Sequence, residues 1–346
     1  MKKQVLFCCF LFLLTSAFIL KSEEDKGYFY IPQNWPKPVY DFAKNPLKKE
    51  KIALGSALFY DPILSRNNTI SCASCHSQYT AFAHIDHRLS HGINDKIGTR
   101  NAPALFNLAW NNSFMWDGAV HHIDAQAIAP ISNPLEMDEK LENIVLKLQK
   151  SKLYPALFKE AYGDSIITGE RTLKAISQFM LTLISANSKY DKVQRKEKGY
   201  QFTESENKGY QLFKQNCANC HKEPLFTTGA FENNGLQPDT LLKDIGRMKI
   251  TKSPKDSLRF KVPSLRNVEV TSPYMHDGRY PNLQMVLFHY TDNIHYSKTL
   301  SKPLLKRIIL NENDKRDLIS FLNTLTDETF LRNPKYSYPR DTFMKQ

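Results

Sequence analysis

Two copies of a Cys-x-x-Cys-His pattern constrain this chain more than any other feature of its sequence. In this pattern two thiols form thioether bonds to one porphyrin, and the adjacent imidazole binds its iron. A dithiol redox pair does not need the histidine, and two zinc half-sites would not both end in Cys-His. We therefore expect two covalent c-type haems. Their attachment residues would be Cys72, Cys75 and His76 in the first copy, and Cys217, Cys220 and His221 in the second.

The amino-terminal residues have the pattern of an export leader. Lys2 and Lys3 precede an apolar run, and small residues at 15–17 offer a cleavage site. We expect residues 1–20 to be a signal peptide and the mature protein to be periplasmic. The alternative is an uncleaved anchor with weak membrane association. The two remaining cysteines, Cys8 and Cys9, lie in this leader, so the mature chain has no thiol left for a disulfide.

The chain has 346 residues and a formal net charge of +12. A basic balance can indicate nucleic acid, an anionic membrane or an acidic protein partner. No nucleic-acid motif accompanies the charge, so we expect no nucleic-acid partner. Two interpretations remain: a generally basic solvated surface, or a weak patch that steers an acidic electron donor.

The two halves of the chain superpose with a constant shift of 160 positions, as from Pro103 to Pro263. This repeat indicates two haem domains of one ancestral kind, although the haem motifs themselves are offset by 145 positions. Gly-x-x-Leu-Phe also precedes both motifs, beginning at Gly55 and Gly209. The residues that the shift pairs are Pro103, Leu105, Asn107, Met115, Asp117 and Gly118 with Pro263, Leu265, Asn267, Met275, Asp277 and Gly278.

Helical periodicity dominates the chain, and strand-like segments are few and short. Helices are expected at residues 45–59, 137–149, 170–186 and 314–325, and after a capping box at Thr203 and Glu206. We expect a mainly α-helical fold with two c-type cytochrome domains related by internal duplication, each holding one covalent haem. The expected divisions are a linker at 21–44, an N-terminal haem domain at 45–195, a C-terminal haem domain at 196–330 and a tail at 331–346.

The repeat also pairs Pro130 with Tyr290, which indicates that the two irons differ. If this position lies over the haem, proline offers no donor atom and leaves the first iron open. A tyrosine phenol oxygen can bind iron. An open iron can react with a small molecule, while a closed iron stores or relays electrons.

Near the open site the sequence offers Gln126 and Glu136. Splitting peroxide requires a group that takes a proton from one oxygen and returns it to the other. A carboxylate in an apolar pocket suits that role because burial raises its pKa. The alternatives are a carboxylate at a helix N-terminus for Glu136 and a structural amide for Gln126.

At this point the chain resembles the bacterial di-haem cytochrome c peroxidases and, in part, the related MauG enzymes. The resemblance covers about residues 47–327, nearly all of the expected mature chain. It rests on segments 70–76, 100–103, 116–118, 133–137, 263–268 and 273–278.

The resemblance implies roles for individual residues. His76 and His221 would be the proximal ligands of the peroxidatic haem in the N-terminal domain and the electron-transferring haem in the C-terminal domain. Glu136 and Gln126 would be the distal acid–base pair. Trp116 would lie between the haems, although core packing would also explain it. The residues implied to hold a calcium ion at the domain boundary are Asn101, Thr271 and Pro273, which would need waters to complete the shell.

Two departures concern the iron ligands. Typical peroxidases of this family have methionine where this chain has Tyr290, and here it resembles MauG; His289 is an adjacent alternative ligand. His91 is a candidate for the loop histidine that caps the peroxidatic haem at rest in many members. His84 and His87 compete with it, and solvent-exposed loop histidines are the simpler interpretation.

The sequence therefore favours a peroxidase that reduces hydrogen peroxide to water. Its electrons would come from a c-type cytochrome or another small redox protein through the C-terminal haem. One alternative is a MauG-like oxidase acting on a protein partner. Another is a non-catalytic di-haem electron carrier or sensor. Homodimers are usual among the proteins that the chain resembles, so a homodimer is a candidate assembly.

Overall fold

The computed structural model describes residues 27–84 and 86–344, and the expected signal peptide lies outside these residues. The fold is mainly α-helical, as predicted, with one two-stranded antiparallel sheet, β1–β2. In the part of the chain that the structure describes, no helix has the length and apolar character needed to cross a membrane. The helices are α1 Lys49–Tyr60, α2 Cys72–Cys75, α3 Ile123–Gln126, α4 Ile128–Ser132, α5 Leu141–Lys150, α6 Tyr154–Tyr162, α7 Gly169–Leu181, α8 Lys189–Gln194, α9 Glu204–Asn216, α10 Met248–Thr251, α11 Leu283–Asp292, α12 Glu312–Asn323, α13 Glu328–Leu331 and α14 Arg340–Phe343, and the strands are β1 Phe231–Glu232 and β2 Phe260–Lys261.

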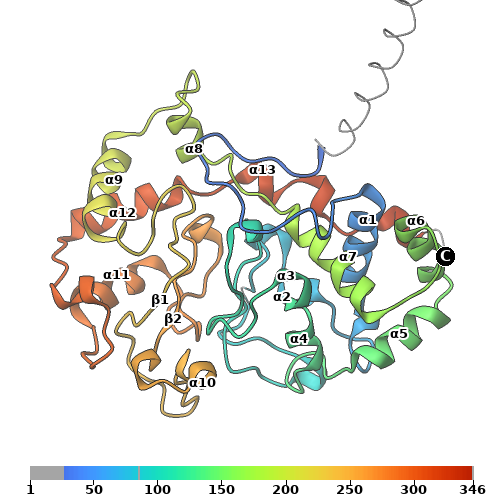
Figure 1. Ribbon diagram of the computed structural model, residues 1–346. Coiled ribbons are helices and arrows are strands. Elements are labelled where there is room, and N and C mark those ends of the chain that lie inside the picture. Colours follow the sequence, from blue (N-terminus) through green and yellow to red (C-terminus); the bar gives the residue numbers. More distant parts are fainter. Residues whose placement is uncertain (1–26, 85, 345–346) are drawn as a thin grey trace, which may run out of the picture.

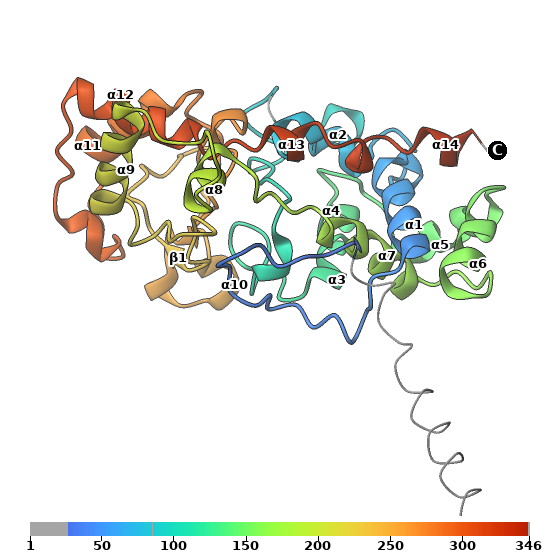
Figure 2. The same ribbon diagram turned by 90° about the horizontal axis from the view of Figure 1, so that it is seen from above.

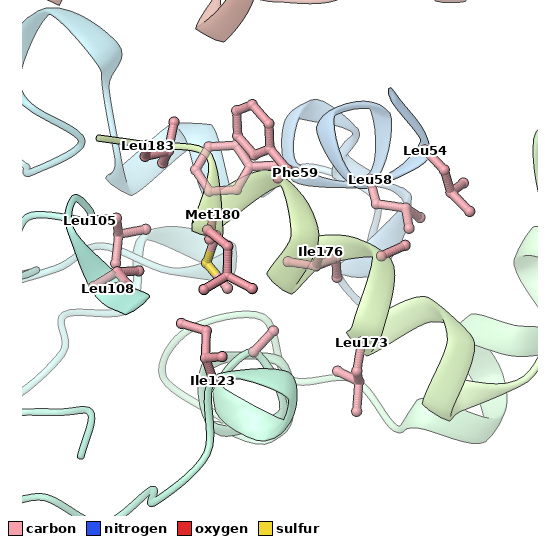
Figure 3. Packing of buried hydrophobic residues seen from close by; sticks show 14 of the residues in the cluster. Leu54, Leu58, Phe59, Leu105, Leu108, Ile123, Leu173, Ile176, Met180 and Leu183 are labelled. Carbon is pink, nitrogen blue, oxygen red and sulfur yellow. The ribbon is translucent and has the colours of Figure 1, made fainter. Parts of the chain in front are cut away.

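The helices form two groups, each around its own hydrophobic core. In Figure 1, α1, α5, α6 and α7 gather on one side, and α9, α11 and α12 on the other. The first core is built mainly from residues 47–186, and the second from residues 190–325. Figure 3 shows α1 and α7 supplying Leu58, Ile176 and Met180 to the first core, with Ile123 of α3 below them.

The repeated glycine before each haem motif lies where two helices cross. A Cβ on Gly55 of α1 would lie 1.9 Å from the carbonyl oxygen of Ala175 in α7. A Cβ on Gly209 of α9 would lie 1.9 Å from the carbonyl oxygen of Asp317 in α12. Only glycine allows backbones to approach this closely. The Gly-x-x-Leu-Phe repeat therefore reflects the same helix crossing in both halves.

The internal duplication is also visible where the two halves meet. Each half donates an arginine to the Asp-Gly turn of the other. The Arg247 guanidinium donates to the carbonyl oxygen of Asp117 at 3.0 Å, and Arg88 donates to that of Asp277 at 3.0 Å. The two aspartates are 160 positions apart, as the sequence repeat predicts. The halves therefore meet in a reciprocal arrangement.

Residues 27–44, expected as a linker, are packed against other parts of the fold. The Trp35 ring meets the Trp110 ring edge-on at 4.9 Å, and Trp110 Nε1 donates to the carbonyl oxygen of Pro36 at 2.8 Å. The guanidinium of Arg266, from the second half, lies over the Trp35 ring, 4.7 Å from its centre. The segment therefore contacts both halves.

The carboxyl-terminal residues return to the first half. Figure 2 shows the chain running from α12 through α13 to α14, beside α1. Phe330 and Leu331 are buried in the first hydrophobic core. The Tyr60 hydroxyl donates to the carbonyl oxygen of Tyr336 at 2.5 Å, and Gln78 Nε2 donates to that of Asn333 at 2.8 Å. The last residues thus complete the half that begins the chain.

The helices predicted at residues 45–59 and 137–149 begin four residues later, at Lys49 and Leu141, and the helix predicted at 170–186 ends early. Helix α7 ends at Leu181, five residues before the predicted end. The backbone N–H of Ser185 donates to Asn107 Oδ1 at 2.9 Å, and that of Ala186 donates to Asp327 Oδ2 at 2.9 Å. Leu183 and Ile184 are buried, as expected, but in a turn held by long-range hydrogen bonds.

Candidate functional site

The first Cys-x-x-Cys-His motif forms the short helix α2 and the residue after it. The His76 Nδ1 atom lies 2.7 Å from the carbonyl oxygen of Phe82. A carbonyl oxygen can only accept, so Nδ1 carries the proton and Nε2 keeps its lone pair. Burial lowers the pKa of His76 to about 4. The ring is therefore held neutral, in the tautomer that binds a metal through Nε2.

The second motif repeats this arrangement after helix α9. His221 Nδ1 lies 3.2 Å from the carbonyl oxygen of Phe226 and 3.1 Å from that of Pro263. Burial lowers the pKa of His221 to about 4 as well. Cys217 and Cys220 are free thiols, as are those of the first motif. Both motifs thus present two free thiols and one imidazole with an available Nε2.

A reverse turn brings Glu136 to the first motif. Pro130 lies in α4, and the chain turns at Asn133, whose amide donates to Glu136 Oε1 at 2.8 Å. Burial raises the pKa of Glu136, and the hydrogen bond from Asn133 opposes that rise. Burial and, to a smaller extent, the negative charge of Glu136 raise the pKa of the Cys75 thiol to about 11. The Glu136 carboxylate therefore lies beside the first motif.

Gln126 is the last residue of α3 and does not contact Glu136 through a hydrogen bond in the described residues. Its amide nitrogen lies 3.8 Å from the sulfur of Met115. Met115 belongs to the loop that leads to Trp116. In the described residues the predicted acid–base pair, Gln126 at the end of α3 and Glu136 after α4, is thus not joined by a hydrogen bond.

Three histidines stack in the loop beside the first motif. The ring centres of His84 and His87 are 5.4 Å apart, and those of His87 and His91 are 4.0 Å apart. The Cys75 thiol donates to the carbonyl oxygen of His91 at 3.4 Å. His91 therefore lies at the first motif, and its imidazole packs on His87.

The second motif faces a different residue. Tyr290 lies in α11, and burial raises the pKa of its phenol to about 12; the nearby Cys217 and Cys220 contribute to that rise. The Asn234 amide lies 3.5 Å from the Tyr290 hydroxyl. The adjacent His289 is fully buried, with Nε2 held 3.0 Å from the carbonyl oxygen of Asn234. Tyr290, and not His289, is thus oriented with its polar atom near the second motif.

Trp116 occupies the junction of the two halves. Its indole N–H donates to the carbonyl oxygen of Asn101 at 2.8 Å, and its own carbonyl accepts from the backbone N–H of Lys261 at 2.7 Å. Trp116 also lines a cleft that is partly open to solvent, whose other walls include Met115 and Pro263. Residues of both halves therefore meet around this ring.

The three residues predicted to hold calcium lie on both sides of the junction. Asn101 is buried, and its amide nitrogen donates to the carbonyl oxygen of Arg88 at 3.3 Å, which leaves Oδ1 available. Thr271 and Pro273 precede the Asp277 turn. Among residues 27–84 and 86–344, no group of three or more His, Cys, Asp or Glu side chains is arranged to hold a metal ion. A cation here would depend on amide and carbonyl oxygens.

Comparison with known proteins identifies the family. The family model for di-haem cytochrome c peroxidase matches residues 49–199. The methylamine utilization protein MauG of Methylorubrum extorquens is 35% identical over 314 residues, which cover 88% of this chain and 84% of the relative. The cytochrome c peroxidase Ccp of Escherichia coli is 40% identical over 260 residues, which cover 73% of this chain and 55% of the relative. The chain belongs to the di-haem cytochrome c peroxidase family.

A solved structure agrees with this membership. The crystal structure of a MauG-like protein associated with microbial copper homeostasis has a TM-score of 0.80 and 30% sequence identity, with 90% of this chain and 99% of that chain covered. Several relatives are named cytochrome c peroxidases. This di-haem peroxidase family member is therefore an enzyme of the peroxidase type with two c-type haems.

The motif residues of this family member fit two haems. Each motif supplies two free thiols and a half-buried, neutral imidazole whose Nδ1 is already bonded to a carbonyl. Such an imidazole has only Nε2 left for iron, as in other metal sites where the second nitrogen is fixed. Cys72, Cys75 and His76 would hold the first haem. Cys217, Cys220 and His221 would hold the second.

Gly92 provides a test of the contact between the histidine loop and Glu136. A Cβ on Gly92 would lie 2.1 Å from the carbonyl oxygen of Leu135 and 2.5 Å from Glu136 Cα. We expect Gly92→Ala to displace Glu136. If Glu136 is the acid–base residue that the resemblance implies, peroxide turnover should fall by about 10²-fold, the effect of misplacing such a group by about 1 Å. Gly27→Ala is the control, since nothing lies within 4 Å of its added carbon. Equal turnover in the two variants would contradict the expectation.

Two residues that sequence reasoning missed also belong to this region. Asn234 contacts both Tyr290 and His289, and Lys261 lines the cleft beside Trp116. Asn234 lies outside the motifs and the helices that the sequence predicts. Lys261 is one of many lysines in a basic chain. Neither has a local sequence signal, because each acquires its neighbours through long-range folding.

Proposed function

We propose that this protein is a periplasmic di-haem peroxidase that reduces hydrogen peroxide to water. The observation that carries the proposal is the difference between the two motifs. A half-buried carboxylate, Glu136, lies beside the first motif, and a phenol, Tyr290, lies beside the second. Residues 45–195 would form the peroxidatic domain and 196–330 the electron-transferring domain. The donor would be a c-type cytochrome or another small redox protein.

The haem held by His76 would supply the iron that reacts with peroxide, and the haem held by His221 would receive the electrons. Glu136 then moves the proton. Its carboxylate takes a proton from one peroxide oxygen and returns it to the other, so that water can leave. Gln126 orients peroxide or water with its amide. In total, two electrons and two protons convert one peroxide into two water molecules.

Residues at the junction would connect the two halves. Trp116 places an aromatic ring between them, which shortens each electron-transfer step. Asn101, Thr271 and Pro273 would supply oxygen ligands to a calcium ion that holds the junction together. His91 lies at the first motif and would cap the open iron in the resting protein. A homodimer and export by residues 1–20 belong to the same proposal.

A MauG-like oxidase acting on a protein partner is the second candidate. It is favoured by Tyr290, because a phenolate ligand stabilises ferric iron and hinders electron entry from a cytochrome.

We expect Tyr290→Met to raise the midpoint potential of the second haem by roughly a hundred millivolts, within the range of about 0.8 V that axial ligands span. A spectroelectrochemical titration measures it. An unchanged potential would show that Tyr290 does not bind this iron.

Steady-state oxidation of a reduced c-type cytochrome by peroxide tests the main proposal. The enzyme is assayed both as isolated and after partial reduction. Turnover only after reduction supports a gated peroxidase capped by His91, and turnover in both states supports an open first iron. Peroxide consumption with altered haem spectra but no cytochrome oxidation supports the MauG-like oxidase. No spectral change at all would exclude both enzymatic functions and favour an electron carrier or sensor.

A further inference from the structure

Lys261, the last residue of β2, has a partly buried ammonium group with few partners. Its Nζ donates to the carbonyl oxygen of Ser113 at 3.2 Å and lies 5.9 Å from the ring centre of Phe114. Burial lowers its pKa to about 8, and no carboxylate in the described residues opposes that change. An ammonium has three N–H donors. A buried cation with one neutral acceptor is costly unless an anion joins it.

The ammonium group borders the cleft at the junction. Lys261 lines this cleft with Trp116 of the first half and with Thr227 and Pro263 of the second. The carbonyl oxygen of Pro263 accepts the hydrogen bond from His221 Nδ1. The cleft is therefore adjacent to the segment that orients the second iron ligand, and it has space beside the ammonium group.

The internal repeat shows that the backbone alone does not require a lysine at this position. Lys261 is 160 positions after Asn101. The backbone N–H of Asn101 donates to the carbonyl oxygen of His276 at 2.8 Å, and that of Lys261 donates to the carbonyl oxygen of Trp116 at 2.7 Å. Each position thus donates its backbone N–H to the loop of the opposite half, Asn101 to the second half and Lys261 to the first. The positive charge is an addition specific to the second half.

We propose that Lys261 forms an ion pair with a propionate carboxylate of the haem attached to Cys217 and Cys220, and thereby raises the reduction potential of that haem. A c-type haem carries two carboxylates, which are the anions that this cleft would receive. Reduction removes one positive charge from the iron, so a fixed cation nearby favours the reduced state. The inference rests on the two haems and not on the peroxidase reaction.

Spectroelectrochemical titration of the haem-loaded protein tests this assignment. Lys261→Gln and Lys261→Met remove the charge, and Lys261→Arg keeps it. Lys249→Gln removes a charge from the exposed face of α10 and is the matched control. We expect both charge-removing variants to favour the oxidised second haem by about tenfold, a downward shift of about 59 mV for one electron. Lys261→Arg and Lys249→Gln should stay near the wild-type potential. The redox transition that shifts in Tyr290→Met is that of the second haem. If neither transition shifts in that variant, the transition that shifts in His221→Met identifies the second haem instead.

Three outcomes overturn the proposal. One is a second-haem potential in Lys261→Gln and Lys261→Met that equals that of Lys249→Gln. A second is a wild-type potential that falls as far on removal of chloride and phosphate as it does in the charge-removing variants. That result would show that a free anion, and not the propionate, pairs with Lys261. If the charge-removing variants fail to retain haem, the position of the carboxylate band in redox-difference infrared spectra with ¹³C-labelled haem carboxylates tests the ion pair. The labelled band should move in Lys261→Arg. An unmoved band is the third outcome that overturns the ion pair.

Discussion

Glu136→Gln is expected to lower peroxide turnover by about 10² to 10⁴ while both haems stay attached. Glutamine keeps the size and the hydrogen-bonding capacity of the side chain but cannot take up a proton, and general acid–base groups contribute rate factors of this size. The measurement is steady-state peroxide reduction, with haem content determined for each preparation. Glu142→Gln, on the exposed first turn of α5, is the control and should keep wild-type turnover.

The pH dependence follows from the same carboxylate. Burial raises the pKa of Glu136, and the proposed mechanism uses its ionised form as the proton acceptor. Turnover should therefore be full above the raised pKa and fall as the pH drops through it. This acidic limb should disappear from the residual activity of Glu136→Gln. An acidic limb that is identical in both proteins would show that another group titrates.

Arg266→Ala is expected to have the largest effect on stability. Arg266 and Asp191 are buried, and two N–H···O contacts of 2.8 Å join the guanidinium to the carboxylate. Removing one partner of a buried ion pair costs about 3–5 kcal/mol, because the other charge is left unpaired. Urea denaturation of the haem-loaded protein measures the change. Arg332→Ala breaks an exposed pair with Glu328 and should cost less than about 1 kcal/mol.

Two further results would distinguish a lost ion pair from lost packing. The double replacement Arg266→Met with Asp191→Leu removes both charges and should be less destabilised than Arg266→Ala.

Burial alone would raise the pKa of Asp191, but the hydrogen bonds and charge of Arg266 outweigh it and lower that pKa. This contribution to stability is present above the ordinary carboxylate pKa and is lost as the pH falls through the lowered value. Arg266→Ala should lose that acid dependence.

Features carried by nearby residues were predictable from the sequence. The haem motifs are contiguous, so their residue types alone predict the chemistry. The 160-position repeat predicted two related halves, and the reciprocal bonds from Arg88 and Arg247 to the Asp-Gly turns agree with it. Helical periodicity located α1, α7 and α12 to within a few residues, except where α7 ends early.

Features that depend on distant residues were not predictable in the same way. The repeat and the family resemblance indicated Glu136 as a residue of the first haem site, but no local pattern placed it beside Cys75, because the two residues are far apart in the chain. The burial of Lys261 depends on a junction formed by both halves. Asn234 becomes a neighbour of Tyr290 only when its loop folds onto α11. Local patterns carry no information about such contacts.

The return of the carboxyl-terminal residues has a consequence for the order in which the protein matures. The second hydrophobic core draws on residues 190–325 only. The first core includes Phe330 and Leu331, which follow the whole second half along the chain. The half that comes first in the chain therefore completes its core only once the residues of the second half are also present. Cys72 and Cys75 lie in the later-closing half, so their thiols have the longer period of access for haem attachment.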